Sequence, residues 1–153
     1  MEIVRYKQPR SVQVVVFIET AAGRDYLLLR RVASHGGFWQ SVTGSLEEGE
    51  THFDAAAREV FEETGIVCCR DDLFELGLVN TFEIAPQWLN KYAPGVTHNE
   101  EVCFALGVTA REVRIDPLEH DDYTWAGFAA ASDMVYWEST RRALTEVERL
   151  LAV

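Results

Sequence analysis

The sequence predicts a single domain of the α/β class, in which a β-sheet packs with α-helices. The chain has 153 residues, 48% of them apolar, which is enough for one hydrophobic core and too few for two comfortable ones. Runs of β-branched and aliphatic residues alternate along it with two amphipathic helical patterns. We therefore expect one domain covering residues 1–153.

Strand-like segments make up most of the regular structure that the sequence predicts. They are Val12–Ile18, Tyr26–Leu29, Phe38–Val42, Leu73–Phe82, Val102–Val108 and a short strand around Trp125 within Leu118–Phe128. A turn from Ala21 to Asp25 separates the first two. The segment Ala85–Asn99 has two prolines, one glycine and no clear period, and a segment of that length without secondary structure predicts a binding loop.

Thr51–Thr64 is the helix with the strongest sequence support. Thr51 is a suitable N-cap, Asp54 stands three residues later in capping-box register, and Gly65 occupies the C-cap position. One helical stripe is apolar and consists of Phe53, Ala56, Ala57 and Val60. A second amphipathic helix is expected over Ser139–Leu151.

The chain lacks the sequence signals of a membrane or exported protein. Its longest uninterrupted apolar stretch, Val14–Ile18, is far shorter than the roughly 20 residues of a membrane-spanning helix. Residues Met1–Arg10 contain charges and a proline but no apolar signal region. The adjacent Cys68 and Cys69, with one further cysteine, favour buried reduced thiols over a disulfide framework. We expect a cytoplasmic protein.

The formal net charge of -11 argues against binding to a nucleic-acid polymer, because no basic patch offsets it. An acidic enzyme that acts on a polyphosphate meets the same repulsion. A divalent cation removes it by neutralising the substrate phosphates and the protein carboxylates together. The charge therefore favours a metal-dependent enzyme if the substrate is a phosphate compound.

Three glutamates give the Thr51–Thr64 helix an acidic face. Glu59, Glu62 and Glu63 stand at positions i, i+3 and i+4, so their carboxylates are expected to project together while the apolar stripe packs inward. Like charges at this spacing weaken a helix by a few tenths of a kcal/mol per pair. A cation among the oxygens relieves that repulsion, and Mg²⁺, with Mn²⁺ as a substitute, suits a site where phosphates supply further ligands.

Neighbouring residues fit the same interpretation. The Arg58 guanidinium can pair with Glu50 or Glu62 and hold the acidic cluster in register. Gly44 and Gly49 allow the preceding loop to fold against the start of the helix. The alternative for an isolated E-x-x-E-E string is a solvated acidic face. The complete pattern from Gly44 to Ile66, G-x5-E-x7-R-E-aliphatic-x-E-E-x-G-aliphatic, arises by chance on the order of once in 10⁵ chains.

Gly44–Ile66 resembles the Nudix box at every position of that pattern. The resemblance implies an α/β/α sandwich with a mixed β-sheet and hydrolysis of a nucleoside diphosphate linked to another group. It also implies that Glu59, Glu62 and Glu63 are catalytic carboxylates or neighbours of the metal, with Glu59 and Glu63 as the preferred ligands. Arg58 is then part of the catalytic cluster.

The flanks resemble one bacterial group of this family, the dihydroneopterin triphosphate pyrophosphohydrolases, which act on the way to folate. The segments that carry this resemblance are Phe38–Ser45, Tyr92–Thr97 and Glu119–His120 before Tyr123 and Trp125. It implies that Lys7, Arg31 and Thr43 contact the substrate, and that Glu119 completes the metal site from outside the helix. For Lys7, Arg31 and Thr43 a solvated surface position is an equal alternative.

The sequence is compatible with three functions. The first is release of pyrophosphate from dihydroneopterin triphosphate, and the second is a house-cleaning hydrolase of deoxynucleoside or oxidised nucleoside triphosphates. The third is a non-catalytic nucleotide-binding module, against which the retention of every carboxylate argues. The expected partner is a small triphosphate, and the chain is a monomer or homodimer. Candidate ring-stacking aromatics, most of them expected in the core, are Phe38, Trp39, Phe82, Trp88, Tyr92 and Trp125.

Overall fold

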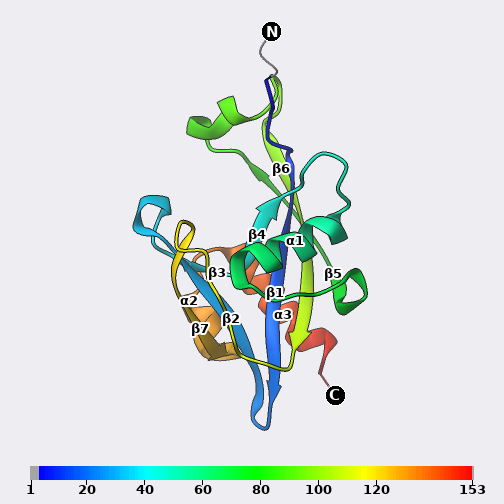
Figure 1. The fold of residues 1–153 in the computed structure, drawn as a ribbon, viewed down its shortest axis with the longest axis vertical. Helices are drawn as coiled ribbons and strands as arrows, with labels where there is room; N and C mark the ends of the chain where they lie inside the picture. The colour runs from blue at the N-terminus through cyan, green and yellow to red at the C-terminus, as the bar shows by residue number, and fades with distance from the viewer. Residues whose placement is uncertain (1–3, 153) are drawn as a thin grey trace.

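A mixed β-sheet lies between helices on its two faces in the computed structural model, which describes residues 4–152 (Figure 1). The strands of this described part are β1 (Arg10–Thr20), β2 (Gly23–Arg31), β3 (Trp39–Gln40), β4 (Val42–Ser45), β5 (Leu73–Glu83), β6 (His98–Val108) and β7 (His120–Gly127). The α-helices are α1 (His52–Thr64), α2 (Phe128–Met134) and α3 (Glu138–Leu150). Short 3-10 helices are η1 (Ala33–His35), η2 (Arg70–Asp72) and η3 (Pro86–Lys91).

Strand β1 is the centre of the sheet. The strand order is β3-β2-β1-β6-β5, with β4 also paired to β1 and β7 to β2. The pairing of β1 with β6 is parallel, and all other pairings are antiparallel. The first half of β1 pairs with β4, as at Val14 and Val42, whereas its second half pairs with β2, as at Phe17 and Tyr26. Strands β4 and β2 therefore share one edge of β1.

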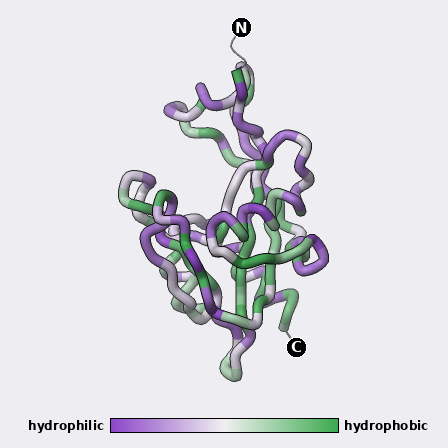
Figure 2. Tube along the Cα trace, viewed as in Figure 1, coloured by the Kyte–Doolittle hydropathy of each residue, from purple (hydrophilic) through white to green (hydrophobic). Residues whose placement is uncertain are grey.

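Alternation along β1 divides the core into two layers. Val12, Val14 and Val16 pack with α1, whereas Val15 and Phe17 face α2 and α3. Figure 2 shows the corresponding hydrophobic stretches along the central strands. Because helices cover both faces, the α/β/α sandwich with a mixed sheet is confirmed.

The N-terminus of α1 is fixed by a reciprocal capping box. The Thr51 hydroxyl accepts the Asp54 N–H at 3.1 Å, and the Asp54 carboxylate accepts the Thr51 N–H at 3.0 Å. At the other end, Gly65 has φ of 75°, a left-handed conformation that glycine adopts without a side-chain clash. Both ends of the helix lie where the sequence predicts them.

Several element boundaries differ from the sequence predictions. The hairpin between β1 and β2 turns at Ala21 and Ala22 alone, so both strands are longer than expected. The run Phe38–Val42 is split, because Gln40 pairs with β2 whereas Val42 pairs with β1. The expected loop Ala85–Asn99 contains η3 and the first residues of β6.

The helix α2 was not predicted, because its small residues give a seven-residue segment no distinct apolar stripe.

The three cysteines are free thiols, as expected, but Cys103 alone is buried, and Cys69 is exposed. Within residues 4–152, none of the helices has the length and apolar character needed to cross a bilayer.

The capping box yields a stability prediction. Thr51→Ala removes the acceptor for the Asp54 N–H and should lower the free energy of unfolding by about 1 kcal/mol. Chemical denaturation monitored by circular dichroism measures the change. Thr109→Ala, at an exposed position in the segment after β6, is the matched control and should leave stability within about 0.5 kcal/mol. Equal effects of the two substitutions would contradict a stabilising role for this cap.

Candidate active site

Two glutamates one turn apart on α1 face the end of β4. The Glu63 carboxylate accepts a hydrogen bond from the backbone N–H of Thr43 at 3.2 Å, and Glu63 is only 6% exposed. The Glu59 carboxylate lies against Gly44, where an added Cβ would come within 2.0 Å of its Cδ atom. Gly44 is therefore required by close packing. The glycine at the start of the Nudix-type pattern, Gly44, therefore leaves the space that the Glu59 carboxylate occupies.

Burial raises the pKa of both carboxyl groups. Loss of solvent is the largest cause for Glu63, whose pKa lies well above its ordinary value, and the Glu59 charge raises it further. Burial also raises the pKa of Glu59, although the Arg58 guanidinium opposes this shift. The pair is therefore an electrostatically costly arrangement that a nearby cation would stabilise.

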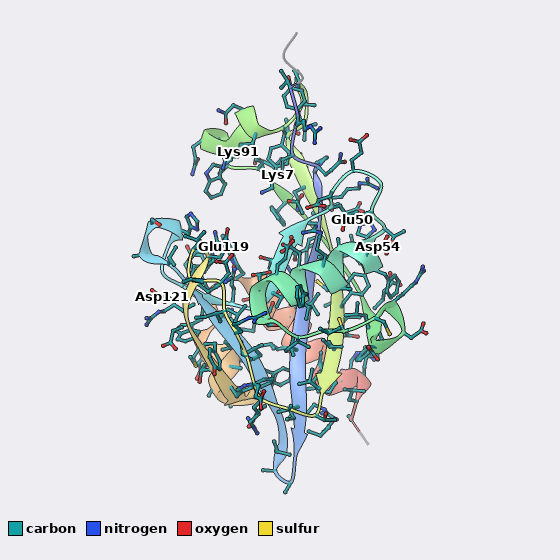
Figure 3. The ribbon with its side chains drawn as sticks, viewed as in Figure 1. Lys7, Glu50, Asp54, Lys91, Glu119 and Asp121 are labelled. Carbon is teal, nitrogen blue, oxygen red and sulfur yellow. The ribbon has the colours of Figure 1, made fainter. Side chains whose placement is uncertain are left out.

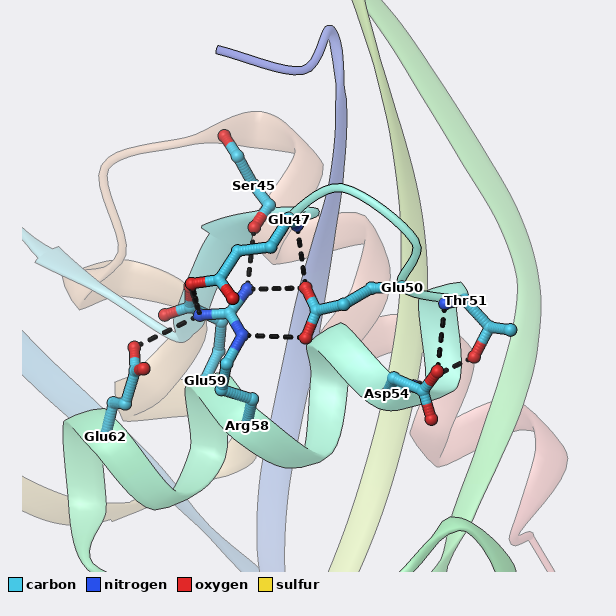
Figure 4. A network of polar contacts seen from close by, with 8 residues as sticks. All are labelled: Ser45, Glu47, Glu50, Thr51, Asp54, Arg58, Glu59 and Glu62. Atoms are coloured by element: carbon cyan, nitrogen blue, oxygen red, sulfur yellow. Dashed lines mark hydrogen bonds and ion pairs between the residues drawn. The ribbon is translucent and has the colours of Figure 1, made fainter. Parts of the chain in front are cut away.

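Arg58 holds the acidic cluster together (Figure 4). Its Nε and Nη2 atoms donate to the two carboxylate oxygens of Glu50 at 2.8 and 2.9 Å, a bidentate pair. Its Nη1 donates to Glu59 at 2.8 Å, and Nη2 also donates to the Ser45 carbonyl at 2.9 Å. The expected pairing with Glu50 is confirmed, and it connects the loop before α1 to the Glu59 side chain.

Glu62 departs from the expected arrangement. Its side chain is 51% exposed and accepts from Arg58 Nη1 at 3.2 Å. Residues at i and i+3 share a helix face only approximately, and this carboxylate follows the guanidinium toward solvent instead of joining Glu59 and Glu63. Glu59 and Glu63 thus form an inner pair, and Glu62 is an outer carboxylate bound by Arg58.

The other residues singled out in the sequence surround this pair. Arg31, at the end of β2, donates to the Glu119 carboxylate at 2.9 Å. Lys7 precedes β1, and its pKa is lowered by partial loss of solvent, with Lys91 and Arg31 lowering it further. Figure 3 shows Lys7 and Lys91 on one side and Glu119 on the loop before β7. Thr43 reaches the site through its backbone amide, within β4.

His120 is a site neighbour that the sequence did not reveal. It is fully buried, and its Nε2 lies 3.6 Å from a Glu63 carboxylate oxygen and 3.5 Å from the Gln40 amide nitrogen. Burial lowers its pKa to about 4, so the ring is neutral at pH 7. A histidine without metal-ligand spacing gave no signal in the sequence, because its position depends on the pairing of β7 with β2.

The candidate aromatics differ in how deeply they are buried. Phe82 and Trp88 are exposed, and Tyr92 is the buried member of the set, with the Lys7 ammonium 5.9 Å from its ring centroid. Phe38 stacks on the exposed Tyr136. Phe82 and Trp88 therefore lie outside the core, whereas Trp39 and Trp125 are half-buried and pack against it.

The carboxylates of the site fit a metal ion only in part. Across the described residues 4–152, no three His, Cys, Asp or Glu side chains converge closely enough to hold an ion by themselves. Of the expected set Glu59, Glu63 and Glu119, the last pairs with Arg31. The inner pair still fits Mg²⁺, which takes one or two carboxylates and fills its remaining positions with water and substrate phosphates.

The fold and the acidic helix define a Nudix hydrolase. The sequence model of the NUDIX domain matches residues 9–146, and the chain therefore belongs to this family.

Two similar proteins of this family carry the same enzyme name. Dihydroneopterin triphosphate diphosphatase of Escherichia coli strain K12 is 40% identical over 143 residues, which cover 92% of this chain and 93% of that enzyme. The enzyme of the same name from Haemophilus influenzae is 33% identical over 144 residues, covering 93% and 89%. The structure of the E. coli dihydroneopterin triphosphate pyrophosphohydrolase covers 95% of this chain and 97% of its own, with a TM-score of 0.77 and 37% identity.

The raised pKa of Glu63 predicts that Glu63→Gln stabilises the metal-free protein at neutral pH. An acid whose pKa rises on folding binds extra protons in the native state, so stability falls as pH increases from its unfolded pKa through its folded pKa. Glutamine does not titrate. In EDTA the variant should therefore melt above the wild type at pH 7, and the difference should shrink toward pH 4.5.

Thermal unfolding between pH 4.5 and 8 measures this difference. Glu48→Gln, at an exposed position in the loop before α1, is the control and should follow the wild type. A lower melting temperature for Glu63→Gln at pH 7 would show that its charge is stabilised by the fold, contrary to this account.

Proposed function

We propose that the chain is a Mg²⁺-dependent pyrophosphohydrolase that converts dihydroneopterin triphosphate to the monophosphate and pyrophosphate, a step toward folate. The observation that carries the proposal is 40% identity over nearly the full length of both chains to an enzyme named for that activity. The buried carboxylate pair of α1 supports the same chemistry. We propose Glu59 and Glu63 as the metal-holding residues and Arg58 as the residue that positions Glu59.

Two cationic side chains near Glu59 and Glu63 could bind the negative charge of a triphosphate. Lys7 and Arg31 lie close enough for the Arg31 charge to lower the pKa of Lys7. An anionic ligand between them would relieve this repulsion and favour the charged form of Lys7. We propose that Lys7 and Arg31 bind phosphate oxygens, and that the backbone around Thr43 lines the same position.

In the reaction, the oxygen of a water molecule bonds to a phosphorus of the α–β anhydride, and the bridging P–O bond breaks. Pyrophosphate leaves, and a carboxylate accepts the proton of the water. When bound, Mg²⁺ polarises the phosphoryl oxygens and lowers the pKa of a water ligand. Arg58 keeps Glu59 in place, and Arg31 orients Glu119, which we propose as a further carboxylate of the site.

Removing either inner carboxylate should abolish most of the activity without unfolding the protein. We expect Glu59→Gln and Glu63→Gln each to lower kcat for pyrophosphate release by about 10²-fold or more, because each loses a charge that the reaction needs. Glu48→Gln, whose side chain is exposed, should retain activity. Normal turnover by the Glu59→Gln, Glu63→Gln double variant would reject the proposed site.

The substrate is decided by kcat/KM for dihydroneopterin triphosphate and the common nucleoside triphosphates in Mg²⁺. A preference for the pterin compound supports the proposal. A large preference for one nucleotide would replace it with a house-cleaning role. Tight binding without product over hours would favour a binding module.

A further inference from the structure

A row of polar side chains crosses the sheet on the face that carries α2 and α3. Ser11 of β1, Glu101 of β6 and Asn80 of β5 are direct cross-strand partners. In the next row, Gln13 pairs with Cys103, which belongs to the core on this face. Burying such groups is costly unless they have hydrogen-bond partners, so each unpaired atom needs an explanation.

Hydrogen bonds fix the orientation of the Glu101 carboxylate. Glu101 is a buried residue, with 7% of its surface exposed. The Ser41 hydroxyl donates to the Gln13 amide oxygen at 2.7 Å, which turns the Gln13 amide nitrogen toward Glu101 Oε1 at 3.2 Å. Asn80 Nδ2 donates to the same Oε1 at 3.1 Å. Within the described residues Oε2 receives no such donor, although a carboxylate oxygen accepts two.

Asn99 supplies a second acceptor without a partner. Its Nδ2 donates to the Ser11 hydroxyl at 2.7 Å, which directs Oδ1 the other way. Residue Asn99 is 4% exposed, and its buried Oδ1 has no hydrogen-bond partner among the described residues. Asn99 and Glu101 are two residues apart on β6 and share one face, about 7 Å apart along the strand. A ligand at this position must bring N–H donors.

An exposed aromatic ring stands beside these acceptors. Phe82 is the direct partner of Asn99 across β5 and β6, and alternation places it on the same face as Asn80. Residue Phe82 is 45% exposed, whereas the neighbouring Asn99 is buried. A flat heterocycle gains from contact with such a ring.

The polar row meets the candidate metal site at β4, although α1 covers the opposite face of the sheet. Gln13 pairs across the sheet with Thr43, whose backbone N–H donates to Glu63. Strands β4 and β6 are separated by β1, so Glu101 lies about 10 Å across the sheet from β4. A triphosphate held near Thr43 and carrying a ring on a short linker can extend along this row.

We propose that Glu101 and Asn99 accept the adjacent ring N–H and amino group of a 2-amino-4-oxopyrimidine edge, with Phe82 against the ring plane. Pterins and guanine share this edge. Adenine presents an amino group beside an acceptor nitrogen, and hypoxanthine lacks the amino group. The inference rests on the proposed function for the position of the phosphates, and it adds the residues that select the ring.

Equilibrium binding of guanosine monophosphate and inosine monophosphate, measured by calorimetry in Mg²⁺, tests this selection without turnover. The two ligands differ by the 2-amino group alone. The wild type should bind the guanine compound at least about 10-fold more tightly, since a site built to accept a donor rejects the analogue without it. Glu101→Gln, which turns an acceptor into a donor, should reduce this ratio to about 1.

Glu100→Gln is the matched control, because Glu100 is the exposed neighbour on the opposite face of β6, and it should keep the wild-type ratio. Asn99→Leu is a second variant of similar shape and should lower the ratio as well. A wild-type ratio near 1, or a Glu101→Gln ratio equal to that of the wild type, overturns the proposal. An unchanged melting temperature identifies a variant that remains folded. The ratio of the two affinities in the wild type tests the proposal even if every variant unfolds.

This experiment separates the two proposals. Selective binding of the guanine compound by a protein that does not hydrolyse dihydroneopterin triphosphate would support the ring subsite and reject the proposed reaction. Hydrolysis of dihydroneopterin triphosphate with equal binding of the two monophosphates would support the reaction and reject the subsite.

Discussion

The packing of two like-charged carboxylates against the end of β4 is the constraint on which the candidate site depends. Loss of solvent raises the pKa of both Glu59 and Glu63, and the Glu59 charge raises the pKa of Glu63 further. The fold maintains this arrangement with a backbone N–H at Thr43, the guanidinium of Arg58 and the absence of a side chain at Gly44. The apolar face of α1 supplies the compensating stability through its burial against β1.

The same sheet connects this acidic pair to the proposed ring subsite. Strand β1 is shared by β4, which contacts Glu63, and by β6, which carries Glu101. Phosphate chemistry and ring selection would then be joined through β4 and β1, with the acidic pair on the face that α1 covers and the ring subsite on the face that carries α2 and α3. Such a division lets a Nudix hydrolase keep its acidic helix while the strand residues determine which ring is accepted.

Local patterns predicted the parts of the molecule that local physics determines. The capping residues Thr51 and Gly65 indicated the ends of α1, and the run of β-branched and aliphatic residues Val12–Ile18 indicated β1. Tertiary pairing determines what the sequence did not predict. His120 approaches Glu63 because β7 pairs with β2, and Glu62 leaves the inner pair because Arg58 holds it near solvent. Neither contact has a signature in the spacing of residues.

The most direct test of the central claim is the anomalous scattering of Mn²⁺ in crystals of this protein soaked with the ion. The account predicts a peak about 2.1 Å from carboxylate oxygens of both Glu59 and Glu63, with water or phosphate oxygens completing the coordination. A peak bound only at the outer carboxylates of Glu50 or Glu62, with Glu59 and Glu63 still uncoordinated, would contradict it.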